Sequence, residues 1–299
     1  MSKIGIVGLG SMGAPIAGRL LDLQSGSQVY GTNRTRAKAS RLVARGLRWR
    51  DTPREVAATA DIVFSMVTDD AALAAITSGP DGILAGLRPD AVYVDMSTVS
   101  PHASRELADQ VRAVGATMLD APVSGSVPAA ETGTLSVMVG GPESAFRVAE
   151  PLLRRLGSTV TYVGSNGQGL LLKLAINISL AAQMLAFSEG LLLASRGGID
   201  PKLAAGAMAA TPVGSPMLKA RVPLVLDLPE QPWFDMRLMH KDIRLALEAA
   251  RDPGVPLPAA AAADAMLARA EEMGLGRQDI AGLFEVLSRS PASAATKAG

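Results

Sequence analysis

One stretch, Gln168 to Arg196, limits the possible folds of this chain more than any other. It reads QGLLLKLAINISLAAQMLAFSEGLLLASR, is rich in good helix formers and has no glycine or proline between Leu170 and Phe187. These residues predict a single helix of about 40 Å. Because apolar residues occupy nearly every side of that helix, protein must cover most of its surface. We therefore expect a long helix that forms the spine of a two-domain protein.

Two polar residues of this helix share one face. Lys173 and Asn177 are one helical turn apart. A lysine among apolar residues either extends along the surface to reach solvent or lies in a polar cavity where its charge is used. This stretch by itself leaves both alternatives open.

The same stretch raises the question of a membrane. Polar residues interrupt it at Lys173, Asn177, Gln183 and Glu189, so no uninterrupted run of about 20 apolar residues remains. The N-terminal residues MSKIGIVGLGSMG lack the apolar core and cleavage site of a secretory signal. We expect a soluble, cytoplasmic protein with no membrane partner.

Composition narrows the function classes. With 299 residues the chain is long enough for two domains, and its formal net charge of +1 gives no reason to expect a nucleic-acid partner. The chain has two histidines, His102 and His240, and no cysteine. We therefore predict no metal site, no thiol chemistry and no disulfide.

The N-terminus carries a glycine motif between a strand and a helix. Lys3 to Val7 is a short apolar run, and a helical pattern extends through Leu21. Between them, Gly8 allows a tight turn, Gly10 allows backbone to approach a pyrophosphate, and Gly13 allows close helix–strand packing. We predict dinucleotide binding by the whole motif, Gly8, Leu9, Gly10, Ser11, Met12 and Gly13. A bare turn is the alternative.

The next strand, Ser27 to Thr32, ends where an acidic residue would bind the ribose hydroxyls of NAD, and no such residue is present. Arg34 can instead pair with a 2′-phosphate, and Asn33 and Thr35 offer hydrogen bonds. NADP is therefore the preferred cofactor, with NAD possible, unless Arg34 is an ordinary surface arginine. Thr35 also predicts the start of a helix that runs to Arg45 and stops at Gly46.

Strands and helices go on alternating after this point. Asp61 to Met66 and Ala91 to Asp95 are predicted strands, and helices begin at Thr52-Pro53 and Ser100-Pro101. In open parallel sheets, ligands bind beyond the carboxyl ends of strands. The residues that follow these two strands are candidates to touch the cofactor, or else ordinary cap and turn residues: Val67, Thr68, Ser97 and Thr98.

A third loop follows the strand Thr117 to Asp120. Ser124, Gly125 and Ser126 lie there, at the start of a possible helix, and would present two hydroxyls and backbone N–H groups to a carboxylate. A flexible turn is the alternative. The predicted remainder of the sheet is a strand, a helix and a strand: Leu135 to Val139, Ser144 to Leu156 and Thr159 to Val163.

Beyond residue 164 the character of the chain changes to all-helical. The predicted domains are an α/β, Rossmann-type NADP-binding domain at 1–164 and an all-helical C-terminal domain at 165–299 that begins with the spine helix. The expected features of the second domain are a helix capped by Asp200-Pro201, a helix from Phe234 to Ala250, an Ala-rich packed segment from Pro256 to Met273, and a loose tail from Ser290 to Gly299.

Four blocks together resemble the β-hydroxyacid dehydrogenase family, which includes 3-hydroxyisobutyrate dehydrogenase and tartronate semialdehyde reductase. They are IVGLGSMGAPIA at 5–16, DAPVSGS at 120–126, GQGLLLKLAIN at 167–177 and the Lys241-Asp242 pair. The resemblance implies that Lys173 is catalytic with Asn177 beside it, and that Ser124, Gly125 and Ser126 hold the substrate carboxylate. It also implies that Thr98, Phe234 and Lys241 lie near the nicotinamide, and that the protein is a homodimer or homotetramer.

Two details refine the resemblance. The turn Asn33-Arg34-Thr35 is similar to that of NADPH-using glyoxylate and succinic semialdehyde reductases of the family. Many relatives have Ser-Gly-Gly in the substrate loop, whereas Ser126 stands at the third place here. A hydroxymethyl group at that place narrows the pocket and adds a donor. Ser126 is similar to the residue of the glyoxylate and succinic semialdehyde reductase branch, which favours a small aldehyde acid.

The expected function is hydride transfer between a nicotinamide cofactor and a short 3-hydroxy acid or aldehyde acid, with Lys173 as general acid and base. Three alternatives remain open. They are a cofactor-binding protein without hydroxyacid turnover, an oxidative decarboxylase of a phosphorylated sugar acid, and a reductase for imines or other carbonyls on the same fold. Imine reductases lack the lysine at this position.

Overall fold

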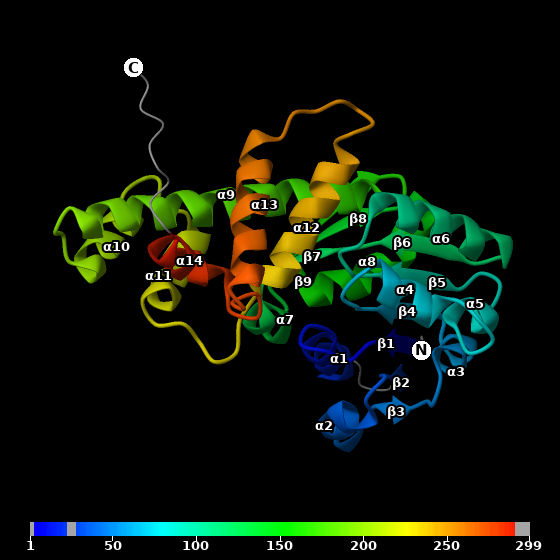
Figure 1. Ribbon diagram of the computed structural model, residues 1–299. Coiled ribbons are helices and arrows are strands. Elements are labelled where there is room, and N and C mark those ends of the chain that lie inside the picture. Colours follow the sequence, from blue (N-terminus) through cyan, green and yellow to red (C-terminus); the bar gives the residue numbers. More distant parts are fainter. Residues whose placement is uncertain (1–2, 23–27, 291–299) are drawn as a thin grey trace. The chain divides into compact units, whose positions relative to one another are not determined.

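The computed structural model describes residues 3–22 and 28–290 (Figure 1). The chain divides into two compact units, Met1–Lys173 and Leu174–Gly299. The first unit is built around a sheet, and the second is helical. One helix, α9 (Gln168–Arg196), begins in the first unit and continues into the second.

In the described residues, the sheet of the first unit has nine strands in the order β3-β2-β1-β4-β5-β6-β8-β7, with β9 paired to β8. These strands are β1 (Lys3–Val7), β2 (Gln28–Thr32), β3 (Arg48–Trp49), β4 (Ile62–Ser65), β5 (Val92–Asp95), β6 (Thr117–Asp120), β7 (Val123–Ser124), β8 (Leu135–Gly140) and β9 (Gly157–Gly164). The strands β1 to β6 pair in parallel, whereas β8 runs antiparallel to β6 and β7. The order 3-2-1-4-5-6 is that of a doubly wound dinucleotide-binding sheet, so the predicted Rossmann-type fold is confirmed.

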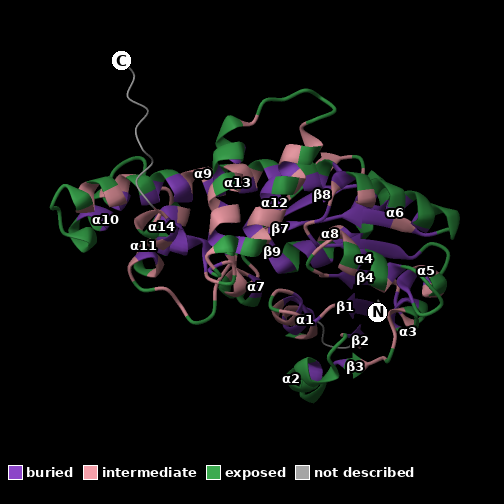
Figure 2. Ribbon diagram, viewed as in Figure 1, coloured by how far each residue is buried: buried purple, intermediate pink, exposed green. Residues whose placement is uncertain are grey.

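The central strands are apolar at successive positions because both faces of the sheet are covered. Ile6 and Phe64 belong to the core on one face, whereas Val7, Val63 and Tyr93 belong to the core on the other. Successive side chains of a strand point to opposite faces, so a strand with two covered faces reads as a continuous apolar run. Figure 2 shows these strands as buried, and the outward surfaces of α2 and α6 as exposed.

Helices connect the strands of this unit. They are α1 (Gly13–Asp22), the 3₁₀ turn η1 (Arg36–Ala39), α2 (Ser40–Ala44), α3 (Pro53–Thr59), α4 (Asp70–Thr77), α5 (Ile83–Gly86), α6 (Pro101–Ala113), α7 (Val127–Thr132) and α8 (Glu143–Leu156). Two predicted N-caps are confirmed: Thr52 Oγ1 accepts the Glu55 N–H at 3.1 Å, and Ser100 Oγ accepts the Ala103 N–H at 2.9 Å.

The helix predicted from Thr35 to Arg45 is wrong in its continuity. The segment forms η1 and then the short α2, and Thr35 makes no side-chain cap hydrogen bond. Ser40 stands at the junction, where its hydroxyl donates to the Ala37 carbonyl oxygen at 2.8 Å. A serine hydroxyl that bonds backbone three residues earlier competes with the regular helical pattern, which accounts for the break.

The spine helix α9 has the bounds that the sequence predicts. Among the described helices it is the one that is long and apolar enough to cross a membrane by length and composition. Leu170, Leu174, Met184 and Leu191 of this helix are buried within the protein. These residues make α9 a core helix of the protein.

In the described part of the second unit, the rest of α9 is followed by five shorter helices and one 3₁₀ turn. They are α10 (Pro201–Ala210), α11 (Pro216–Leu226), α12 (Met236–Ala249), α13 (Pro258–Glu272), η2 (Ile280–Gly282) and α14 (Leu283–Arg289). The side chains of α12 and α13 pack together, and Figure 1 shows the two helices side by side. Ala260, Ala263 and Ala270 are buried, which confirms that the Ala-rich segment is packed.

The start of α12 and the C-terminal tail differ from the rest of this unit in how they compare with the prediction. The helix predicted from Phe234 begins at Met236, with Asp235 as its N-cap, so Phe234 precedes the helix and the prediction is wrong there. Asp235 Oδ1 accepts the Leu238 N–H at 2.7 Å, and this cap sets the start of the helix. The loose tail predicted from Ser290 to Gly299 lies, apart from Ser290, outside the described residues.

Candidate functional site

The glycine turn between β1 and α1 has the shape of a phosphate cradle. Gly8 adopts a φ of +93°, and a Cβ at Gly8 would lie 2.3 Å from the Met66 carbonyl oxygen. A Cβ at Gly13 would lie 2.0 Å from the Gly8 carbonyl oxygen, whereas a Cβ at Gly10 would meet nothing within 4 Å. Gly8 and Gly13 are therefore required by packing, and Gly10 faces open space before the start of α1. That arrangement fits the diphosphate of a dinucleotide.

The turn after β2 is tied to this glycine turn by one side chain. Asn33 Oδ1 accepts the Leu9 N–H at 3.0 Å, and Asn33 Nδ2 donates to the Thr35 carbonyl oxygen at 3.0 Å. Arg34 is exposed beside it. The structure therefore gives Asn33 a role within the protein, as a link between the two turns, and places Arg34 at the carboxyl end of β2.

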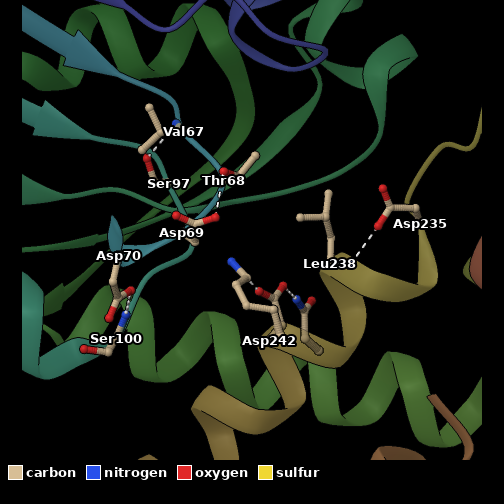
Figure 3. Close-up of polar contacts among 11 residues, drawn as sticks. Val67, Thr68, Asp69, Asp70, Ser97, Ser100, Asp235, Leu238 and Asp242 are labelled. Atoms are coloured by element: carbon tan, nitrogen blue, oxygen red, sulfur yellow. Dashed lines mark hydrogen bonds and ion pairs between the residues drawn. The ribbon is translucent and has the colours of Figure 1, made fainter. Parts of the chain in front are cut away.

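The turns after β4 and β5 are also joined (Figure 3). The Val67 N–H donates to Ser97 Oγ at 2.9 Å, and the Ser100 N–H donates to Asp70 Oδ1 at 2.9 Å. Thr68 is exposed and Thr98 is half-buried, so both stand at the carboxyl edge of the sheet. Ser97 differs from them because it is fully buried beneath the turn.

The predicted carboxylate loop lies between β7 and α7. Ser124 ends β7, and Ser126 is at the N-cap position of α7 without a side-chain cap hydrogen bond. Gly125 is exposed, with a φ of +134°, and a Cβ there would lie 2.8 Å from Leu135 Cδ2. Both serines are half-buried. The loop therefore is an ordered turn in which glycine is required by conformation and by packing.

The start of α9 is held by a buried carboxylate for which the sequence alone predicts no role. Asp120, at the end of β6, is fully buried. Its Oδ1 accepts the Gly167 N–H at 2.8 Å, and its Oδ2 accepts the Leu170 N–H at 3.1 Å. Burial raises the pKa of Asp120, and these hydrogen bonds oppose that rise. In the sequence, the signal for this role is an acidic residue that directly follows the apolar Met118 and Leu119 of a short strand.

Lys173 and Asn177 occupy successive turns of α9. Lys173 is 8% exposed and Asn177 is fully buried. Such burial goes against the alternative of a lysine that extends into solvent. Asp120 fixes the first turn of this helix, so the position of Lys173 follows directly from that anchor.

In the helical unit, Asn177 contacts the pair Lys241-Asp242. Asn177 Nδ2 donates to Asp242 Oδ2 at 2.6 Å, and Lys241 Nζ lies 2.9 Å from Asp242 Oδ1. Figure 3 labels Asp242 on α12. Asp242 is 2% exposed. The hydrogen bond from Asn177 is charge-assisted, and the Lys241 ammonium adds an ion pair to the same carboxylate. The sequence motif includes Asp242 without predicting it as a site residue, and the structure places it between Asn177 and Lys241.

Phe234 is positioned by a second buried ion pair. Arg221 Nη1 lies 2.7 Å from Asp279 Oδ1, and Asp279 Oδ2 accepts the N–H groups of Trp233 at 2.8 Å and Phe234 at 3.1 Å. The Phe234 side chain packs against the helical core. Since Asp279 holds consecutive backbone N–H groups, the loop before α12 has a defined course.

No group of three or more metal-ligating side chains occurs within residues 3–22 and 28–290. The arrangement of the first unit, with a cradle for phosphates and an exposed arginine at the end of β2, is that of a dinucleotide site. Asn177, which follows Lys173 on α9, belongs to the second unit.

Comparison with known proteins agrees with this geometry. Residues 3–164 match the family model described as the NAD binding domain of 6-phosphogluconate dehydrogenase. Residues 167–287 match the one described as the NAD-binding of NADP-dependent 3-hydroxyisobutyrate dehydrogenase. Both models describe nicotinamide-dependent enzymes, and together they cover both units.

Individual relatives cover nearly the whole chain. Glyoxylate/succinic semialdehyde reductase 2, chloroplastic, of Arabidopsis thaliana is 33% identical over 285 residues, which are 95% of this chain and 79% of that protein. The 2-hydroxy-3-oxopropionate reductase of Escherichia coli (strain K12) is 34% identical over 285 residues, which are 95% of this chain and 97% of that protein.

A solved structure, Psf3 in complex with NADP+ and 2-OPP, superposes with a TM-score of 0.86 at 27% sequence identity, and the match covers 95% of this chain and 99% of that chain. The expected fold, enzyme class and nicotinamide cofactor are thereby confirmed. The chain belongs to the β-hydroxyacid dehydrogenase family of NAD(P)-dependent oxidoreductases.

Proposed function

We propose that this enzyme uses NADPH to reduce a short aldehyde or keto acid to the corresponding hydroxy acid, and catalyses the reverse reaction with NADP. The observation that carries the proposal is the buried Lys173 on the anchored first turns of α9, with Asn177 one turn further on. The names of the two relatives, a glyoxylate/succinic semialdehyde reductase and a 2-hydroxy-3-oxopropionate reductase, support this substrate class.

The residues divide the chemical work as follows. The bound nicotinamide supplies the hydride. The Lys173 ammonium donates a proton to the carbonyl oxygen of the substrate during reduction, and takes a proton from the hydroxyl during oxidation. Asn177, held by Asp242, orients Lys173 or the substrate hydroxyl.

Substrate and cofactor are positioned by the loops of the sheet. The hydroxyls and backbone N–H groups of Ser124, Gly125 and Ser126 bind the substrate carboxylate, and so fix the distance of the reacting carbon. The cofactor is held by the glycine turn and by residues at the carboxyl ends of the strands, together with two residues of the helical unit. These residues are Gly8, Leu9, Gly10, Ser11, Met12, Gly13, Asn33, Arg34, Thr35, Val67, Thr68, Thr98, Phe234 and Lys241.

We further propose that the enzyme is cytoplasmic and forms a homodimer or homotetramer. Neither nucleic acid nor a membrane is a partner in this proposal. The domain boundary is proposed near residue 164, where β9 ends. NADP is preferred because Arg34 stands where an NAD enzyme would carry an acidic residue.

The test is NADPH and NADH oxidation with glyoxylate, succinic semialdehyde, tartronate semialdehyde and methylmalonate semialdehyde. Lys173→Ala is expected to lower kcat by about 10²- to 10⁴-fold while NADPH affinity stays near that of the wild type. Lys202→Ala, which removes an exposed lysine of α10, is the matched control and should leave kcat unchanged. A Lys173→Ala variant with wild-type kcat would remove Lys173 from the mechanism.

Two alternative functions are separated by the same assays. NADPH binding without turnover of any of these acids would favour a cofactor-binding protein. Turnover that requires an added amine would favour imine reduction. Lys173, Asn177 and the serine loop together favour the hydroxyacid reaction, because a protein that only binds cofactor needs none of them.

A further inference from the structure

A buried carboxylate that the proposed mechanism does not use lies at the end of β5. Asp95 is fully buried, and its Oδ1 accepts hydrogen bonds from Ser65 Oγ at 2.6 Å and Ser97 Oγ at 2.7 Å. Its Oδ2 has no hydrogen-bond partner among the described residues. A buried carboxylate with an unsatisfied oxygen costs folding free energy, so its presence calls for an explanation.

The hydrogen bonds of Asp95 have a defined direction. Because an ionised carboxylate only accepts, both serine hydroxyls must donate to it. The lone pairs of Ser97 Oγ therefore face the Val67 N–H, which donates to that oxygen at 2.9 Å (Figure 3). Similarly Tyr93, whose hydroxyl lies 2.7 Å from Ser65 Oγ, is the donor in that contact.

This chain of hydrogen bonds ends at the Met66–Val67 peptide, which contacts the glycine turn after β1. The Met66 N–H donates to the Val7 carbonyl oxygen at 3.0 Å, and the Met66 carbonyl oxygen lies 2.3 Å from where a Cβ at Gly8 would be. The Met66–Val67 peptide thus contacts the turn after β1 and is held through Ser97 by the end of β5. These are the turns around the point where strand order reverses, between β1 and β4, which is where such sheets bind dinucleotides.

We propose that Asp95 is a positioning residue for the nicotinamide cofactor, which acts through Ser97 to hold the Met66–Val67 peptide and the turns that contact the cofactor. The inference rests on the proposed cofactor site. It adds a role for two residues, Asp95 and Ser97, that do not themselves touch the cofactor.

The ionised form of Asp95 is the one that holds Ser97 most strongly, since hydrogen bonds to a charged acceptor are stronger. Burial raises the pKa of Asp95 to about 6, against the hydrogen bonds from the two serines. Among the described residues, Tyr93 and Asp120 are the titratable groups that face it. Tyr93 has its pKa raised well above 10 by burial, so it stays neutral, and Asp120 on β6 raises the pKa of Asp95 further.

The test measures the Kd of NADPH by fluorescence from pH 5 to pH 8 for wild type, Asp95→Asn and Ser97→Ala. Asp95→Asn keeps an oxygen acceptor but resembles the protonated acid. Its Kd should exceed that of the wild type about 3-fold or more at pH 8 and equal it at pH 5. The ratio of the two Kd values cancels the titration of the 2′-phosphate and of the histidines, which is common to both proteins.

Ser97→Ala removes the acceptor of the Val67 N–H and should raise the Kd about 3- to 10-fold at pH 8. Ser104→Ala is the matched control, because Ser104 is a fully buried serine of α6 outside this chain of hydrogen bonds. It should leave the Kd unchanged, and melting temperatures establish that each variant is folded.

Three results would overturn the proposal. A Kd ratio for Asp95→Asn that stays constant with pH, or a Ser97→Ala variant that binds NADPH like Ser104→Ala, would show that the cluster only supports folding. In both cases the proposed function stands, provided that the wild type binds NADPH and reduces an aldehyde acid. A wild type that binds neither NADPH nor NADH would overturn both proposals together.

Discussion

At the scale of single residues, cofactor choice depends on the turn after β2. Asn33 uses its carboxamide to join this turn to the glycine turn, and Arg34 beside it is an exposed cation at the carboxyl end of the strand. A guanidinium can pair with a 2′-phosphate in a bidentate manner, whereas the ribose hydroxyl of NAD offers it no charge.

Arg34→Ala is expected to raise the KM for NADPH about 10- to 100-fold, because a hydrogen-bonded charge pair is lost, and to change the KM for NADH less than about 2-fold. Steady-state kinetics with both cofactors measure this. Arg36→Ala is the control, because Arg36 lies over the Trp49 ring, with its guanidinium carbon 5.3 Å from the ring centroid. An equal rise in the KM for NADH would mean that Arg34 does not bind the 2′-phosphate.

Asp95 also makes stability depend on pH. Its pKa is about 6 in the folded protein, against 3.8 as its ordinary value. Between about pH 4 and pH 6 the folded protein keeps a proton that the unfolded chain has lost, so the contribution of Asp95 to stability is complete below pH 4 and is lost as pH rises through 6.

The free energy of unfolding of Asp95→Asn minus that of the wild type should therefore depend on pH. We expect this difference to be larger at pH 8 than at pH 4 by up to about 3 kcal/mol. Urea denaturation at both pH values measures the difference. A constant difference between the two proteins would show that Asp95 does not titrate in this range.

At the scale of elements, the turn between β1 and α1 separates glycines required by packing from a glycine that faces ligand. Gly13→Ala places a Cβ against backbone and should lower the melting temperature by several degrees. Gly10→Ala meets no protein atom within 4 Å, so it should melt like the wild type yet bind NADPH about 10-fold or more weakly. Melting curves and NADPH titrations of the two variants test this contrast, and a Gly10→Ala variant with wild-type affinity would refute it.

The anchoring of α9 by Asp120 is a second property of elements. Asp120→Ala leaves the Gly167 and Leu170 N–H groups buried without their acceptor, which should cost about 1–3 kcal/mol of stability. Because the first turn of α9 then shifts, kcat should fall about 10- to 100-fold, with the KM for NADPH changed less than about 3-fold.

The control for this variant is Asp61→Ala. Asp61 also accepts a backbone N–H, from Lys3 at 2.8 Å, but it is partly exposed and far from α9 in the sequence. The Asp61→Ala variant should lose little stability and keep the kcat of the wild type. If Asp120→Ala lost stability alone, with kcat intact, Asp120 would serve the fold and not the position of Lys173.

At the scale of the whole molecule, the two units have separate apolar cores joined by one continuous helix. A cofactor that binds only the folded chain stabilises it by mass action. NADPH at 100 times its Kd should raise the free energy of unfolding by about 2.7 kcal/mol, and NADH at the same concentration should raise it less. Thermal unfolding with each cofactor measures this, and an equal rise with both would contradict the preference for NADP.

The sequence by itself determined the features that depend on neighbouring residues. The strand, turn and helix at the glycine motif, the bounds of α9 and the caps at Thr52, Ser100 and Asp200 were predictable from it. Glycine conformation, capping side chains and apolar runs act within a few residues, so their signals can be read along the chain.

Only the tertiary structure decided which distant polar groups meet. Asp120 holds the Leu170 N–H from 50 residues away, and Asn177 meets Asp242 across 65 residues. Asp95 lies directly opposite Asp120 because β5 and β6 pair in that register. Register and helix packing are set by the burial of whole faces rather than by local preference, so the buried carboxylates that hold this site in place could not be identified from the order of residues alone.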